Sequence, residues 1–156
     1  MKETRGRPNP NTRHSSSDKS EIDRLTHAML RAFTTSPGEA VDLSVLNRLF
    51  IPQALVIKSC GLPLEICNLA EFIAPREKLL NSGSLVDFEE REIRETTRIF
   101  GDVAQRFSHY RKSGVLDGTP FETHGMKSLQ FVRTQDGWRI SSLIWDDERE
   151  GLEIPR

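Results

Sequence analysis

Long hydrophobic runs, cysteine, tyrosine and an excess of charge of one sign are all scarce in this sequence. No apolar run approaches the ~18 residues of a membrane-spanning helix, so we expect no membrane partner. The 22 Lys and Arg nearly balance the 23 Asp and Glu, which argues against a generally basic nucleic-acid-binding domain. Cys60 and Cys67 lack CxxC spacing and two cysteines alone do not make a zinc site, so we expect thiols and no metal site.

The first residues carry charge but lack the apolar segment that a secretory signal requires. Pro8, Pro10 and a run of three serines predict a disordered basic tail over residues 1–19. No aromatic residue is interleaved with its charges, so we interpret the tail as solvated. Without a secretory signal, we expect the protein to be cytoplasmic. The chain length of 156 residues corresponds to one domain, which we place at 20–150, followed by a C-terminal tail over 151–156.

The first half of the chain has apolar residues at helical spacing. This spacing predicts helices over 21–34, 43–50 and 69–80, with a short strand over 54–59 between the second and third. Pro75 is predicted to kink or split the third helix, because proline removes a helical hydrogen bond.

From Leu85 onward the apolar period changes to two, which is typical of strands. The predicted strands cover 85–100, 102–113, 120–134 and 138–147, and Asp136-Gly137 is a hairpin signal. Helices followed by an antiparallel meander indicate an α+β fold. The absence of βα alternation, of GxGxxG and of a P-loop argues against a nucleotide-binding sheet.

Two segments have a familiar pattern, namely Phe100–Tyr110 and Gly137–Glu148. With the junction Leu49–Ala54, they resemble the nuclear-transport-factor-2-like superfamily, in its SnoaL-like and ketosteroid-isomerase-like branch. The resemblance implies a cone-shaped α+β fold, in which N-terminal helices pack on a strongly curved antiparallel sheet (a cystatin-like α+β barrel) and leave a cavity at the open end. This fold hosts enzymes, ligand carriers and association domains, so the resemblance alone does not imply a reaction.

The acid and base positions of ketosteroid-isomerase-like members are occupied differently here. Lys58 stands where the resemblance places an aspartate base, and Met29 or Leu30 stands where it places a tyrosine. The second oxyanion donor, an aspartate in those relatives, falls near Lys127 or Ser128. Steroid-type isomerisation by that apparatus is therefore not expected, and a single tyrosine argues against scytalone-dehydratase-like chemistry as well.

Other polar residues lie on the predicted strands. Strict alternation places Glu92 and Arg94 on one face of their strand, and Arg106 and Tyr110 together on one face of the next. A phenol and a guanidinium can hold a carboxylate or enolate. The candidate catalytic residues are Tyr110, His109 and Glu92. The candidate ligand-binding residues are Arg94, Arg106, Tyr110, Trp145, Phe72 and Lys58.

The leading hypothesis is a small-molecule-binding domain whose cavity takes a mostly apolar or aromatic ligand with one polar end, without a cofactor. The eight phenylalanines and the apolar last strand favour such a cavity. One alternative is an isomerase, dehydratase or cyclase with a non-standard acid and base set. Another is a non-catalytic homodimerisation domain, and we expect a homodimer in every case because long strands offer a self-complementary surface.

Overall fold

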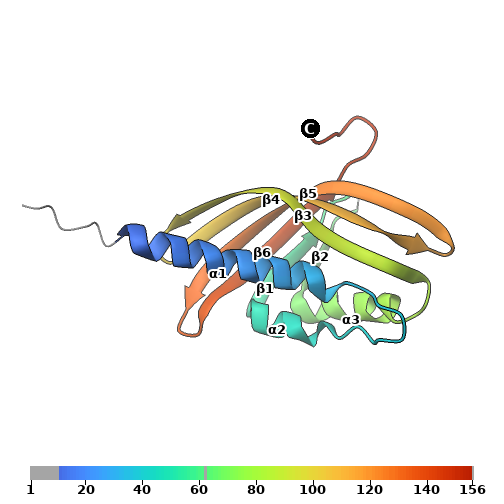
Figure 1. The fold of residues 1–156 in the computed structure, drawn as a ribbon, viewed down its shortest axis with the longest axis horizontal. Coiled ribbons are helices and arrows are strands. Elements are labelled where there is room, and N and C mark those ends of the chain that lie inside the picture. Colours follow the sequence, from blue (N-terminus) through green and yellow to red (C-terminus); the bar gives the residue numbers. More distant parts are fainter. Residues whose placement is uncertain (1–10, 62, 156) are drawn as a thin grey trace, which may run out of the picture.

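The computed structural model describes residues 11–61 and 63–155, and its helices precede four long strands (Figure 1). The elements in chain order are α1 (Asn11–Ala32), the 3-10 turn η1 (Leu43–Val45), α2 (Leu46–Leu49), β1 (Phe50–Lys58), β2 (Glu65–Asn68), α3 (Leu69–Leu80), β3 (Leu85–Phe100), β4 (Val103–Leu116), β5 (Thr119–Thr134) and β6 (Gly137–Asp147). This order confirms the predicted α+β class.

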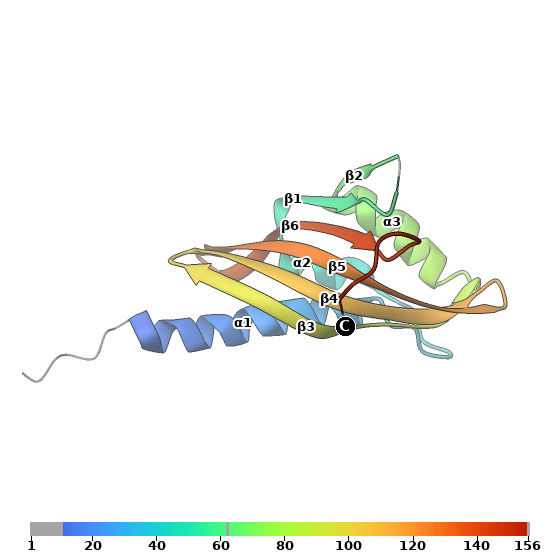
Figure 2. The same cartoon turned by 90° about the horizontal axis from the view of Figure 1, so that it is seen from above.

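The six strands form one sheet in the order β2-β1-β6-β5-β4-β3. Strands β3 to β6 make the predicted antiparallel meander, whereas β1 pairs with β6 in parallel, so the sheet is mixed. The short strand β2 was not predicted; it pairs with β1 through Val56 and Cys67. The sheet curves over the helices, which lie against one of its faces (Figures 1 and 2).

Helix α1 begins at Asn11, ten residues before the predicted start at Glu21. The predicted tail is thus helical from Asn11 onward, while residues 1–10 lie outside the described part of the chain. Tertiary hydrogen bonds explain the difference: the carboxylate of Asp18 accepts bonds from both terminal nitrogens of Arg133 at 2.9 Å and from Nε1 of Trp138 at 3.1 Å. These partners lie more than 110 residues away, so helical periodicity does not reveal them.

Strand β3 contains a bulge that reverses its faces. Glu92 pairs with Tyr110 and Arg94 pairs with His109, which leaves Ile93 as an extra residue on β3. A bulge of this kind shifts the alternation by one position. Glu92 therefore faces the helices while Arg94 is exposed, and the prediction that these two share a face is wrong.

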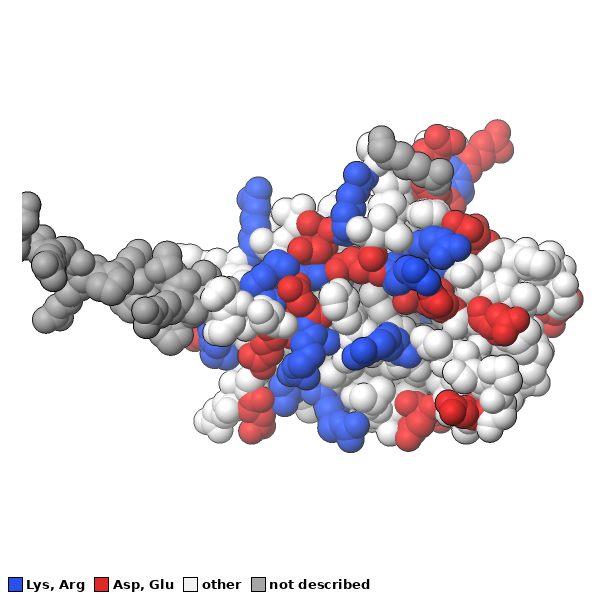
Figure 3. Space-filling view, viewed as in Figure 1, with Lys and Arg blue, Asp and Glu red and all other residues white. Residues whose placement is uncertain are grey.

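Helix α3 runs without interruption through Pro75, so the predicted split is not observed. Its start is a capping box, in which the Asn68 side chain accepts a bond from the Glu71 backbone and the Glu71 side chain accepts one from the Asn68 backbone. No helix within residues 11–61 and 63–155 is long and apolar enough to cross a membrane. On the face that Figure 3 shows, basic and acidic side chains are interspersed.

The core lies between the helices and the inner face of the sheet. Trp138 and Ile140 on β6 and Leu129 on β5 are fully buried there. They pack with α1 residues such as Leu25 in one apolar cluster. The same cluster extends along the inner face to Phe72 of α3 and Trp145 of β6.

Candidate functional site

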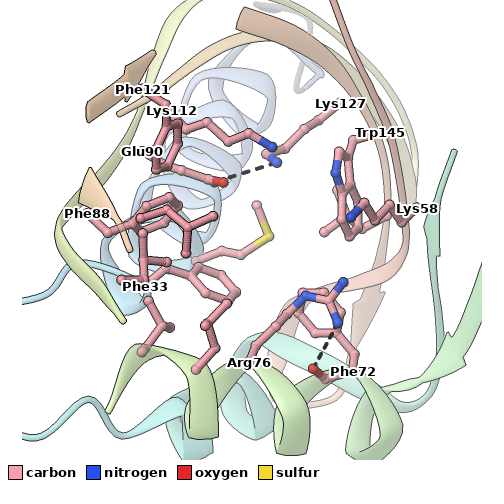
Figure 4. A pocket seen from close by; sticks show the side chains of 16 residues that line it. Phe33, Lys58, Phe72, Arg76, Phe88, Glu90, Lys112, Phe121, Lys127 and Trp145 are labelled. Carbon is pink, nitrogen blue, oxygen red and sulfur yellow. Dashed lines mark hydrogen bonds and ion pairs between the residues drawn. The ribbon is translucent and has the colours of Figure 1, made fainter. Parts of the chain in front are cut away.

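A cavity of about 310 Å³ lies between α1, α3 and the curved sheet. Most of its wall is apolar, and Figure 4 shows these side chains around an open centre. The apolar lining residues are Met29, Phe33, Phe72, Leu79, Leu80, Leu85, Phe88, Leu116, Phe121, Leu143 and Trp145. The charged lining residues are Lys58, Arg76, Glu90, Lys112 and Lys127. The otherwise apolar wall of the cavity thus carries four cationic side chains and one carboxylate.

Lys127 on β5 is the most buried of these cations, with 5% of the residue exposed. Its Nζ lies 3.5 Å from Oε2 of Glu90. The same nitrogen lies 3.9 Å from the ring centroid of Tyr110 and 5.1 Å from that of Trp145. Figure 4 shows Lys112, Lys127 and Glu90 gathered on one wall of the cavity.

Burial lowers the pKa of Lys127 below its ordinary value, because the charged amine has lost water on all sides. The Glu90 carboxylate acts in the opposite direction, and the nearby positive charge of Lys112 adds to the lowering. Lys127 therefore releases its proton more readily than an exposed lysine does. For the same reason its ammonium form gains from any anion that enters the cavity.

Tyr110 on β4 forms the wall behind Lys127. Its ring packs on the backbone of Gly125, where a Cβ atom would overlap the phenol and lie 2.5 Å from the carbonyl oxygen of Asp146. Its hydroxyl donates to the Asp147 carboxylate, which also accepts from Nζ of Lys112 at 2.8 Å. Burial, and next the hydrogen bond to Asp147, raise the pKa of Tyr110 well above its usual range. Tyr110 is therefore a neutral supporting group.

Arg76 on α3 stacks over aromatic rings of the cavity. Its guanidinium carbon lies 4.0 Å from the ring centroid of Phe72 and 5.6 Å from that of Trp145. Nη1 donates to the Phe72 carbonyl and to Oε1 of Glu65, both at 3.2 Å. Lys58 ends β1 and is exposed. These two cations are better solvated than Lys127.

Arg106 lies on the same inner face of the sheet as Tyr110, as predicted, but its hydrogen-bond partners differ from those of Tyr110. Its guanidinium donates to Glu92, to Asp23 of α1 at 2.6 Å and to Thr97 at 3.1 Å. Burial raises the pKa of Glu92, but the hydrogen bonds from Arg106 and Ser108 outweigh it and lower the pKa overall. Arg106 therefore ties α1 to the sheet and does not line the cavity.

His109 lies on the outer side of β4, between the inward-facing Ser108 and Tyr110. Its Nε2 lies 2.9 Å from Nδ1 of His124, whose Nε2 lies 3.2 Å from Oε1 of Glu122. Glu92 contacts Arg106 on the inner side. The three candidate catalytic residues, Tyr110, His109 and Glu92, are therefore held in three separate sets of contacts.

The cavity brings together three of the predicted ligand-binding residues, namely Lys58, Phe72 and Trp145. It does not include Arg94, whose guanidinium donates to the carbonyl oxygen of Pro155 on the outer side. The sequence analysis did not name Glu90, Lys112 or Arg76 as site residues. It named Lys127 only as a residue near the position of the second oxyanion donor. A signal for Lys127 existed, because it alternates with Leu129 and Phe131 on a buried strand face.

No protein-family model matches the sequence, and no curated protein matches it significantly. Several solved structures are similar. A nuclear-transport-factor-2-like superfamily protein from Salmonella enterica has a TM-score of 0.71 at 16% identity, over 91% of this chain and 99% of its own. A protein with a cystatin-like fold from Novosphingobium aromaticivorans, also described as nuclear-transport-factor-2-like, has a TM-score of 0.66 at 18% identity, over 90% and 91%. The association domain of CaMKII from C. elegans has a TM-score of 0.65 at 15% identity, over 83% and 95%.

These likenesses show the fold of this chain. It is the nuclear-transport-factor-2-like α+β cone, which confirms the resemblance inferred from the segments Phe100–Tyr110 and Gly137–Glu148. The placement within the SnoaL-like branch stays a prediction. What the cavity does has to be argued from its own residues, because one fold hosts many functions.

Proposed function

We propose that this protein binds a small organic anion, with an apolar or aromatic body and one carboxylate-like end, in the cavity of the cone. The observation that carries the proposal is the ratio of four cations to one carboxylate in an otherwise apolar wall. The sequence analysis expected a ligand with one polar end, and this proposal adds that the polar end carries a negative charge. Lys127 is the group that gains most from it, since an anion offsets the cost of its burial.

The cavity suits this ligand in size and in chemistry. Its volume of about 310 Å³ lies at the lower end of the ~300–1,000 Å³ that small-molecule sites occupy. Phe33, Phe88 and Phe121 line the part near α1 and β3, where an apolar body loses water on binding. Lys112 and Lys127 lie at one wall, where an acid group can accept hydrogen bonds from both.

The proposal is tested by calorimetry with a matched pair of ligands, cinnamate and cinnamyl alcohol, which share a body and differ in charge. We expect the acid to bind at least about tenfold more tightly, since hydrogen bonds between charged groups contribute ~1.5–3 kcal/mol. Lys127→Met is expected to remove that preference. Lys78→Met is the control, because Lys78 is exposed on α3 and does not line the cavity.

Equal affinity for the acid and the alcohol would contradict a site for an anion. So would a preference for the acid that survives in Lys127→Met, or one that is lost in Lys78→Met. A panel of aromatic and aliphatic acids without any binding would remove the proposal for this class of ligand.

A second candidate function, homodimerisation through the outer face of the sheet, is favoured by a separate observation. Phe107 and Ile144 lie on either side of Ser128 in one row across β4, β5 and β6. Phe107 is 56% exposed and Ile144 is 40% exposed, and exposed apolar patches often mark interfaces. The similar CaMKII domain is an association domain by name. Sedimentation equilibrium is expected to show a dimer that Phe107→Glu converts to a monomer, and a wild-type monomer would refute this candidate.

A further inference from the structure

The amine of Lys127 has surroundings that differ from those of the other cavity lysines. It is buried at 5% exposure, it lies against the rings of Tyr110 and Trp145, and it faces the cavity. Lys112 extends to the same wall from β4, as Figure 4 shows. A lysine that is desolvated in an apolar pocket beside a second cation is a common form of activated amine nucleophile.

We propose that Lys127 is a nucleophilic amine that forms an imine with the carbonyl carbon of an aldehyde or ketone bound in the cavity. The inference rests on the proposed function in one respect: the carbonyl compound enters the cavity proposed for the organic anion, and its carbonyl group lies at Lys127 in the place of the acid group. It adds the chemical class of the reacting group and assigns the residue that reacts with it.

The reaction balances without an oxidant or reductant. The lone pair of neutral Nζ attacks the carbonyl carbon, a C–N bond forms, and the carbonyl π electrons move to oxygen, which takes up a proton. Nitrogen loses a proton to give the neutral carbinolamine. The hydroxyl group then takes up a proton and leaves as water, and loss of the last N–H proton gives the neutral imine. Hydrolysis reverses the same steps.

Glu90 is placed to carry protons between these steps. Its Oε2 lies 3.5 Å from Nζ of Lys127, and its side chain is 12% exposed. A carboxylate at this position accepts the proton that Lys127 must lose before attack. It then returns a proton to the departing hydroxyl group, as a general acid does. Glu90 is thus assigned as the proton carrier of the pair.

Lys112 and Lys58 are poorer candidates for the nucleophile. Nζ of Lys112 donates to Oδ2 of Asp147 at 2.8 Å, and attack by this nitrogen on a carbonyl group would break that ion pair. Lys58 is exposed and lacks the apolar surroundings of Lys127. The lowered pKa of Lys127 supports the same choice, since more of this amine is neutral near pH 7.

The test is reductive trapping of the full chain with 4-carboxybenzaldehyde and sodium cyanoborohydride, followed by peptide mass spectrometry. We expect the Lys127 peptide to gain the mass of the aldehyde less one oxygen. Trapping at Lys127 near pH 7 is expected to be roughly tenfold faster than at the exposed Lys78, because a desolvated amine is more often neutral. Lys127→Met is expected to remove the fast phase, Lys78→Met to keep it, and Glu90→Gln to slow it while 4-methylbenzoate still binds.

Label spread over the lysines in proportion to their exposure would overturn the inference, and so would fast label on Lys112. The unreactive 4-methylbenzoate separates this failure from failure of the proposed function. If it binds and Lys127 is not trapped, the anion site stands and the imine is refuted. If Lys127 is trapped rapidly and 4-methylbenzoate neither binds nor competes, the imine stands and the preference for an anion is refuted.

Discussion

Two buried cations on the inner face of the sheet have opposite surroundings. Arg106 on β4 is 2% exposed and Lys127 on β5 is 5% exposed. Arg106 lies beneath α1, where Glu92, Asp23 and Thr97 accept its hydrogen bonds. Lys127 lies beside the cavity, and Glu90 is the carboxylate within ion-pair distance of it among the described residues.

The difference between the two cations shows how the inner face of the sheet serves both stability and ligand binding. A guanidinium that is surrounded by acceptors has little to gain from a ligand, and its removal leaves buried carboxylates without a counter-charge. A desolvated ammonium with one carboxylate beside open space gains from an incoming anion. Burial of charge by itself therefore does not identify a site; the number of partners and the adjoining cavity do.

The largest effect is expected from Arg106→Met. This variant leaves Glu92, whose side chain is 6% exposed, without its guanidinium, and breaking such a buried pair costs about 3–5 kcal/mol. Urea unfolding followed by circular dichroism measures the loss. The double variant Arg106→Met with Glu92→Met is expected to recover much of it, and a single-variant loss below about 1 kcal/mol would show that the pair behaves like a surface ion pair.

A smaller effect is expected from Gly125→Ala, which disturbs the wall behind Lys127. The added Cβ overlaps the Tyr110 ring, and overpacking of this kind costs about 1–3 kcal/mol. Near-ultraviolet circular dichroism is expected to change, because Tyr110 must leave its position. Gly114→Ala is the control, since its Cβ would meet neighbours only at 3.2–3.3 Å, and an equal loss in both variants would contradict the special role of Gly125.

The smallest effect on stability concerns Lys127→Met and depends on pH. Because the folded-state pKa of Lys127 is lowered, the unfolded chain binds more protons in the window between that pKa and 10.5. The wild type therefore gains stability as pH rises through this window, by about 1.4 kcal/mol for each pKa unit of lowering, and the Met variant lacks this gain. Unfolding at pH 7 and pH 10 measures the difference, and a constant gap between wild type and variant would refute a desolvated amine.

Much of the fold was predictable because its signals are local. Period-two alternation placed the four long strands within three residues of their observed ends, and helical spacing located α3. Three of the cavity residues were predicted too, since Phe72 and Trp145 are large apolar groups and Lys58 stands where the family resemblance places an aspartate base. The bulge at Ile93 was not, because it depends on how β3 pairs with β4.

The sequence by itself determined the α+β class, the meander and a buried apolar face, because apolar periodicity and turn residues act over a few neighbouring positions. Only the tertiary structure decided which charges meet. Arg106 and Lys127 both alternate with buried residues, and nothing local separates them. Asp23 reaches Arg106 from α1 and Glu90 reaches Lys127 from β3, because the packing of the helix on the sheet and the pairing of the strands bring distant residues together. The balance of charge in a cavity is thus a property of the folded chain.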